Sequence, residues 1–144
     1  MNHSPAKVLG EYLKAQSIAT AFGSGSDWAC FISHYPDGTD YDNVIVLFDT
    51  PGVRQGRLMN GTEIIRPGVQ VMVRAQDYET GYQKMEAIKT CLAAVSSTSQ
   101  AVSGSTYTIQ NASLQSNTGA LTEEESSRRR QIFTANYLLT ISEV

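Results

Sequence analysis

The strongest constraint on the fold is the excess of strand-like over helix-like segments. Several stretches show the apolar runs or the apolar–polar alternation typical of strands, whereas only residues 5–16 and 78–96 show helical spacing. Because parallel strands need a crossover connection, usually a helix, two helices are too few for a parallel sheet. We therefore predict an α+β fold, with a mainly antiparallel sheet packed with two helices.

Each helical stretch has a cap and one apolar stripe. Ser4 and Pro5 suit the N-cap and first position of the first helix, and Asp77 suits the N-cap of the second. The stripe of the first helix consists of Val8, Leu9, Tyr12 and Leu13. That of the second consists of Tyr78, Tyr82, Met85, Ile88, Leu92 and Val95. Each helix can thus bury one face against a sheet.

The strand-like stretches differ in how much of them should be buried. Residues 43–48 form a continuous apolar run, typical of a central strand buried on both faces. Residues 69–76 and 133–142 alternate, which predicts strands with one wet face. We expect shorter strands at 28–34 and 106–112, a serine-rich loop at 96–105 and a polar segment at 115–130.

Residues 51–68 are dense in turn formers and predict a projecting β-hairpin arm. They include two Pro-Gly pairs and Asn60-Gly61, which suits the two central positions of a type I′ turn. Residues 49–52, Asp-Thr-Pro-Gly, are expected to end the preceding buried strand in a turn.

Composition bounds the function without naming it. The 144 residues carry a net charge of −3, so we expect one domain over residues 1–144, without the positive field that non-specific DNA binding uses. Charged residues make up 17%, below the roughly 25% that is usual, which suits a surface in contact with neighbours. We expect neither a signal peptide nor a membrane partner, and hence synthesis in the cytoplasm.

Catalytic chemistry is hard to place in this sequence. Residues 44–52 resemble a GTPase switch strand ending at Asp49, but no glycine-rich phosphate loop with its lysine accompanies them. His3 and His34 are isolated, and Cys30 would lie about 13 Å from His34 along one strand. Both Cys30 and Cys91 have apolar neighbours and suit a core. A loop holds three aspartates, which we expect to be solvated rather than to bind Ca²⁺: Asp37, Asp40 and Asp42. We expect no enzyme activity, cofactor or metal.

Opposite charges adjoin near the end of the polar segment. The acidic run is Glu123, Glu124 and Glu125, and the basic run is Arg128, Arg129 and Arg130. Three readings remain open for the arginines: pairing with a neighbouring subunit, a solvated face, or proximity to DNA.

Four stretches in the first two thirds of the chain resemble one family of phage proteins. They are residues 43–52 (NVIVLFDTPG), 58–63 (LMNGTE), 66–74 (RPGVQVMVR) and 78–87 (YETGYQKMEA). The resemblance is to the minor capsid proteins of bacteriophages that are similar to the tail terminator proteins of long-tailed phages. It covers about residues 5–96.

The resemblance implies a structural virion protein of the neck, at the head-tail junction, assembled in the cytoplasm of the bacterial host. Such a subunit forms a homo-hexameric ring that caps the tail tube, stops its polymerisation and docks the head connector or adaptor. DNA passes through the lumen without specific binding. We expect the subunit or tube interface at Arg54, Arg57, Glu63, Arg66, Glu123, Glu124, Glu125, Arg128, Arg129 and Arg130.

Two alternatives remain at this point. One is a head-completion or connector-adaptor protein of the same neck. The other is a small nucleotide or phosphate hydrolase built on residues 49–52.

Overall fold

The computed structural model describes residues 1–23, 27–36, 41–61, 63–116, 119–123 and 130–143. Two helices are present among these residues, α1 (Pro5–Ala15) and α2 (Tyr78–Ala93). The strands are β1 (Ala29–Ile32), β2 (Val44–Arg57), β3 (Glu63–Ala75), β4 (Thr98–Val102), β5 (Ser105–Leu114), β6 (Gly119–Glu123) and β7 (Gln131–Glu143). The α+β class and both helices are confirmed.

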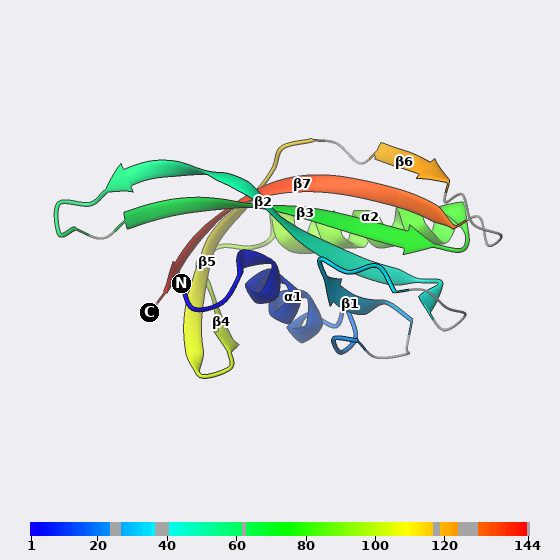
Figure 1. Ribbon diagram of the computed structural model, residues 1–144, viewed down its shortest axis with the longest axis horizontal. Coiled ribbons are helices and arrows are strands. Elements are labelled where there is room, and N and C mark those ends of the chain that lie inside the picture. Colours follow the sequence, from blue (N-terminus) through cyan, green and yellow to red (C-terminus); the bar gives the residue numbers. More distant parts are fainter. Residues whose placement is uncertain (24–26, 37–40, 62, 117–118, 124–129, 144) are drawn as a thin grey trace.

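The strands form one mixed sheet around β7. Its order is β1-β2-β3-β7-β5-β4, with β6 also paired to β7. Only the β1–β2 pairing is parallel among the described strands, so the sheet is mainly antiparallel as predicted. The last strand lies inside the sheet, with β3 along one side and β6 and β5 in succession along the other (Figure 1).

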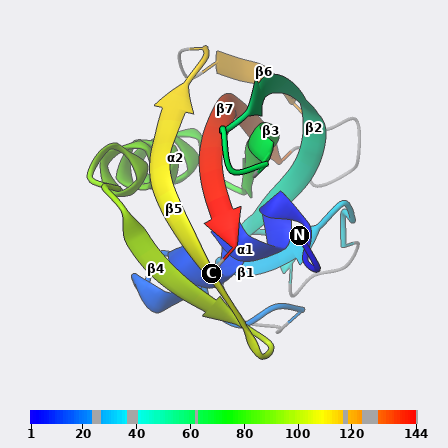
Figure 2. The same cartoon turned by 90° about the vertical axis from the view of Figure 1, so that its left-hand side faces the viewer.

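Both helices cover the same face of the sheet, and the sheet curls around them. α1 contacts the edge strands β1 and β4 as well as β2 and β3, while α2 lies against β3, β7 and β5 (Figure 2). The main core contains Leu9 and Leu13 of α1, Ile88 and Leu92 of α2, and alternate residues of the strands. Neither helix is long and apolar enough to cross a membrane in the part of the chain that the structure describes.

Helix capping follows the sequence closely. The Ser4 hydroxyl accepts from the Lys7 N–H at 3.2 Å, and the Asp77 carboxylate accepts from the Thr80 N–H at 3.2 Å. Each bond satisfies an N–H group that a helix start leaves without an intrahelical partner.

The first half of β2 is buried on both faces, as predicted for a central strand. Ile45 and Leu47 belong to the main core, whereas Val44 and Val46 form a second cluster on the outer face. The sequence predicted that one face of β3 would be exposed to solvent. That prediction is wrong for the part of β3 paired with the first half of β2, because Met72 and Arg74 are only 7% and 1% exposed. Under this second cluster, the Arg74 Nη2 donates to the carbonyl oxygens of Pro36 and Tyr41, which gives this buried nitrogen two acceptors.

The serine-rich loop expected at 96–105 is a β-hairpin instead. Ser103 and Gly104 both have positive φ, +43° and +90°, and they join β4 to β5 between the paired residues Val102 and Ser105. Two consecutive positive φ values are those of a type I′ turn, which is preferred in two-residue hairpins. Serine seldom adopts a positive φ, so the Ser103-Gly104 pair gave only a weak turn signal.

The buried stripe of α2 predicts a severe effect for Leu92→Asp. Leu92 is 1% exposed, and an unpaired buried carboxylate costs several kcal/mol against a total stability of about 5–15 kcal/mol. We expect loss of cooperative thermal unfolding by circular dichroism. The matched control, Gln83→Asp at an exposed position of α2, should unfold within a few degrees of the wild type. A cooperative Leu92→Asp variant would show that this helix face is not core.

Candidate functional site

The β2–β3 hairpin extends well beyond the body of the domain (Figure 1). Its backbone pairing runs from Val44 with Arg74, inside the core, to Arg57 with Glu63, near the tip. Neither apolar cluster includes any residue between Asp49 and Arg66. The projecting arm predicted from sequence is therefore present, and it is built outside the core.

The expected turn at residues 49–52 is wrong, because β2 continues through it to Arg57. The register shifts between Thr50 and Val53 and again between Arg54 and Gly56, which marks two irregularities in the pairing. A β-bulge absorbs an extra residue and raises the local twist, and it also tolerates a proline such as Pro51. The arm consequently twists where it leaves the domain.

Glycines let the two strands of the arm approach closely at this twist. A Cβ on Gly52 would overlap the carbonyl oxygen of Arg66, and a Cβ on Gly68 would overlap the Thr50 hydroxyl oxygen. A side chain at Gly52 would push the strands apart, and one at Gly68 would displace the Thr50 side chain. The two Pro-Gly pairs noted in the sequence thus form the base of the arm rather than separate turns.

The tip of the arm does not use the predicted type I′ turn. Gly61 has a φ of +86°, but Asn60 is not among the residues with positive φ. The Gly61 N–H donates to the Leu58 carbonyl oxygen at 2.9 Å, so Met59 and Asn60 occupy the central positions of the turn. A five-residue connection between Arg57 and Glu63 favours such a turn over a two-residue one.

The arm exposes large apolar side chains. Val53 and Leu58 are 53% and 49% exposed, and Met59 is fully exposed. Arg54 and Arg57 are exposed on the same arm. Exposed apolar side chains interleaved with arginines are typical of protein–protein contact surfaces.

The remaining arm residues predicted for an interface are less exposed or undescribed. Arg66 is half-buried, and its Nε is buried without a hydrogen-bond partner among the described atoms. It lines a hollow of about 200 Å³ on the outer face of the sheet with Asn111 and Thr140. Glu63 lies opposite Arg57 in the register, and its side chain is outside the described residues.

The structure describes only the two ends of the predicted acidic-basic run, Glu123 and Arg130. Glu123 ends β6, opposite Gln131 of β7, with its side chain undescribed. Arg130 is 2% exposed, and its guanidinium lies 3.6 Å from the Asp42 carboxylate and donates to the Tyr41 carbonyl oxygen. In the single chain, this arginine is held internally. The other four lie outside the described residues: Glu124, Glu125, Arg128 and Arg129.

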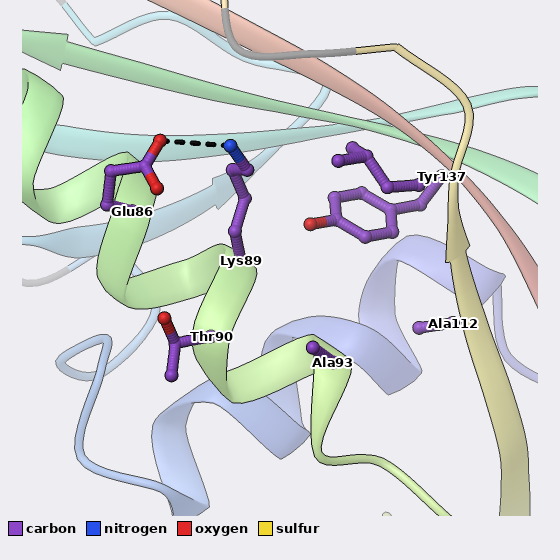
Figure 3. A pocket seen from close by; sticks show the side chains of 7 residues that line it. Glu86, Lys89, Thr90, Ala93, Ala112 and Tyr137 are labelled. Carbon is purple, nitrogen blue, oxygen red and sulfur yellow. Dashed lines mark hydrogen bonds and ion pairs between the residues drawn. The ribbon is translucent and has the colours of Figure 1, made fainter.

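Two hollows beside α2 are lined by few side chains that could act in catalysis. One of about 390 Å³ separates α2 from β5 and β7, and Figure 3 shows Glu86 and Lys89 at its rim with Tyr137 opposite. The Lys89 ammonium donates to the Glu86 carboxylate at 2.9 Å, so the two charges pair with each other. Burial raises the pKa of Tyr137 to about 12, and its phenol therefore stays protonated at neutral pH. A second hollow, of about 480 Å³ between α1 and α2, is mainly apolar.

Asp49 has a structural contact in place of the switch-like role considered from sequence. Its Oδ1 accepts a hydrogen bond from the Ala6 N–H at 2.9 Å, in the first turn of α1. The carboxylate thereby fixes the start of α1 to the point where β2 leaves the core. Sequence spacing gives no sign of this bond, because the partners are 43 residues apart.

The other candidate catalytic residues are dispersed. Cys30 is buried in the core, His34 is exposed near the end of β1, and Cys91 is half-buried. His3 is held at the N-terminus by its ring Nδ1, 2.9 Å from the Tyr107 hydroxyl oxygen. Within the described ranges, no group of three His, Cys, Asp or Glu side chains could hold a metal ion. Asp37 and Asp40 of the aspartate loop lie outside those ranges.

Comparison with known proteins gives one family. The family model described as "Bacteriophage tail terminator protein" matches residues 12–143. No curated protein matches the chain. Among solved structures, the chain is similar to a chain of the "Virion of native gene transfer agent (GTA) particle", with 14% identity and a TM-score of 0.45 over 77% of this chain and 78% of that one.

The Asp49 contact predicts that Asp49→Ala destabilises the fold. Losing a side-chain acceptor at a helix start costs about 0.5–2 kcal/mol, and Asp49→Asn should lose less because it keeps an acceptor oxygen. Urea unfolding followed by fluorescence measures both variants. An Asp49→Ala chain with unchanged unfolding free energy would contradict this anchoring role.

Burial of Cys30 predicts a thiol that resists modification. Burial raises the pKa of Cys30 to about 12, so almost no thiolate forms at pH 8. We expect mass spectrometry after iodoacetamide treatment to find Cys91 modified first and Cys30 modified only in denaturant. Fast alkylation of Cys30 in the native chain would contradict its place in the core.

Proposed function

The chain belongs to the bacteriophage tail terminator protein family, and from that premise we propose that it forms a homo-hexameric ring that caps the head-proximal end of the tail tube. The ring would stop polymerisation of the tube and provide the docking surface for the head connector. The family is one of structural virion proteins and not an enzyme family, and its match over residues 12–143 confirms the resemblance found from sequence. That match is the observation that carries the proposal.

The β2–β3 arm supports assembly with other chains. It exposes Val53, Leu58 and Met59, which no part of the described chain covers. Apolar side chains that stay in water in a monomer become favourable when a partner buries them. We propose that this arm supplies one side of the subunit or tube interface, with Arg54, Arg57, Glu63 and Arg66 as its charged residues.

A closed ring needs two different surfaces on each subunit, because each copy contacts its neighbours head to tail. The acidic-basic run is a second candidate surface. We propose that Glu123, Glu124, Glu125, Arg128 and Arg129 contact a neighbour, while Arg130 links this run to the domain through Asp42. In the proposed ring, a net charge of −3 per subunit suits a lumen through which DNA slides without being held.

The proposal treats residues 1–144 as one domain. The main core joins residues of α1 near the N-terminus to residues of β7 near the C-terminus, which supports this proposal. A single domain with one projecting arm would be a suitable ring subunit.

Light scattering after size-exclusion chromatography tests the proposal. A subunit of 15.7 kDa should give a mass close to six times that value, either alone or after mixing with the tail-tube protein of the same phage. Monomers in both conditions would contradict the terminator role. Assembly only on the head connector would instead favour a connector adaptor of the neck.

A further inference from the structure

The start of α2 exposes an unusual group of side chains. Tyr78 and Tyr82 are 48% and 43% exposed, and Glu79 lies beside them in the first turn. We call Tyr78, Glu79 and Tyr82 the aromatic–acidic patch. Apolar residues at helical spacing usually mark the buried face of a helix, yet this end of the stripe faces solvent.

The two tyrosine rings are held in place from below. Both pack edge-on against the buried ring of Phe133 in β7, with ring centroids 5.1 Å away for Tyr78 and 6.4 Å for Tyr82. Rings fixed in this way lose little conformational freedom when a partner covers them. The patch is therefore a preorganised surface.

The Glu79 carboxylate is available to pair with a cationic group of another chain. It is exposed, and no ion pair joins it to any residue that the structure describes. A carboxylate on the same helix turn as two exposed tyrosine rings can attract a guanidinium through its charge, and the ring faces can attract it as well.

The tip of the arm has the complementary chemistry. Arg57, Leu58 and Met59, here called the arm tip, combine one guanidinium with two exposed apolar side chains. Methionine sulfur packs favourably against aromatic rings, and tyrosine and arginine are enriched among the residues that dominate binding energy.

Within one chain these two surfaces cannot meet. The arm projects from one end of the long axis, whereas α2 begins at the opposite end, where β3 finishes (Figure 1). Two complementary surfaces at opposite ends of a subunit generate a head-to-tail contact between copies.

We propose that the arm tip of one copy docks on the aromatic–acidic patch of the next copy, with Arg57 facing Glu79. This inference rests on the proposed ring and names the contact that closes it. The occupant of the patch is a second copy of this chain, since both halves of the contact are present in its own sequence.

A charge-reversal cycle tests the contact. Arg57→Glu and Glu79→Arg should each raise the protein concentration needed for half-assembly about tenfold or more, because each places like charges together. The chain carrying both reversals restores opposite charges and should assemble close to the wild type. Glu79→Gln, which adds no cation at the helix start, should weaken assembly less than Glu79→Arg.

Thr90→Arg is the matched control. Thr90 is exposed on the same side of α2, about three turns beyond Glu79, and its substitution should leave assembly unchanged. Thermal unfolding of every variant within a few degrees of the wild type would show that the changes act on assembly and not on folding.

The outcomes separate this inference from the proposed function. A wild-type chain that never assembles would overturn both. Rings that form equally well with either single reversal, or that the double reversal fails to restore, would overturn the arm–patch contact and leave the terminator role standing. Loss of tube-protein binding by Arg57→Glu, with ring formation intact, would assign the arm tip to the tube and also overturn the contact.

Discussion

The antiparallel pairing of β2 with β3 is the interaction on which the rest of the structure depends. This pair of strands begins between the main core and the second apolar cluster, passes through two shifts in register and ends near the exposed tip of the arm. Its inner half carries core residues such as Ile45 and Val71, and its outer half carries none. Burial therefore fixes the inner half, and backbone hydrogen bonds extend that rigidity into solvent. The surface proposed for assembly thus extends from the sheet without taking part in the core.

Much of the fold follows from apolar periodicity. The stripe of α2 and the double-sided burial of Val44 to Leu47 could be predicted because burial of many side chains enforces one pattern. The predictions failed where local chemistry or distant contacts decide. Ser103 adopts a positive φ that serine disfavours, which hid a hairpin, and β2 passes through Pro51-Gly52 because Gly52 and Gly68 permit a close crossing. Arg74 is buried on a face expected to be exposed to solvent, where its Nη2 donates to carbonyl groups 33 and 38 residues away.

Only part of the candidate site could be predicted from the sequence. An arm with exposed arginines could be anticipated from the turn formers and charges of residues 51–68. The aromatic–acidic patch could not, because Tyr78 and Tyr82 fit the apolar stripe of α2, and only the three-dimensional arrangement shows that their rings pack on Phe133 while staying largely exposed. Likewise, Asp49 matched a switch-like motif, yet its structural contact is the first turn of α1. The motif suggested the wrong role for Asp49 because a short segment of sequence does not show which distant residues it contacts.

The central claim is that the core folds without the arm, whereas assembly requires it. Sedimentation velocity of a chain in which residues 54–65 are replaced by an Asn-Gly turn tests this most directly. The register places Val53 opposite Arg66, so a two-residue turn can join them. We predict a compact monomer under conditions in which the wild type is expected to assemble into rings. Rings that persist without the arm, or an expanded and aggregated chain, would contradict the account.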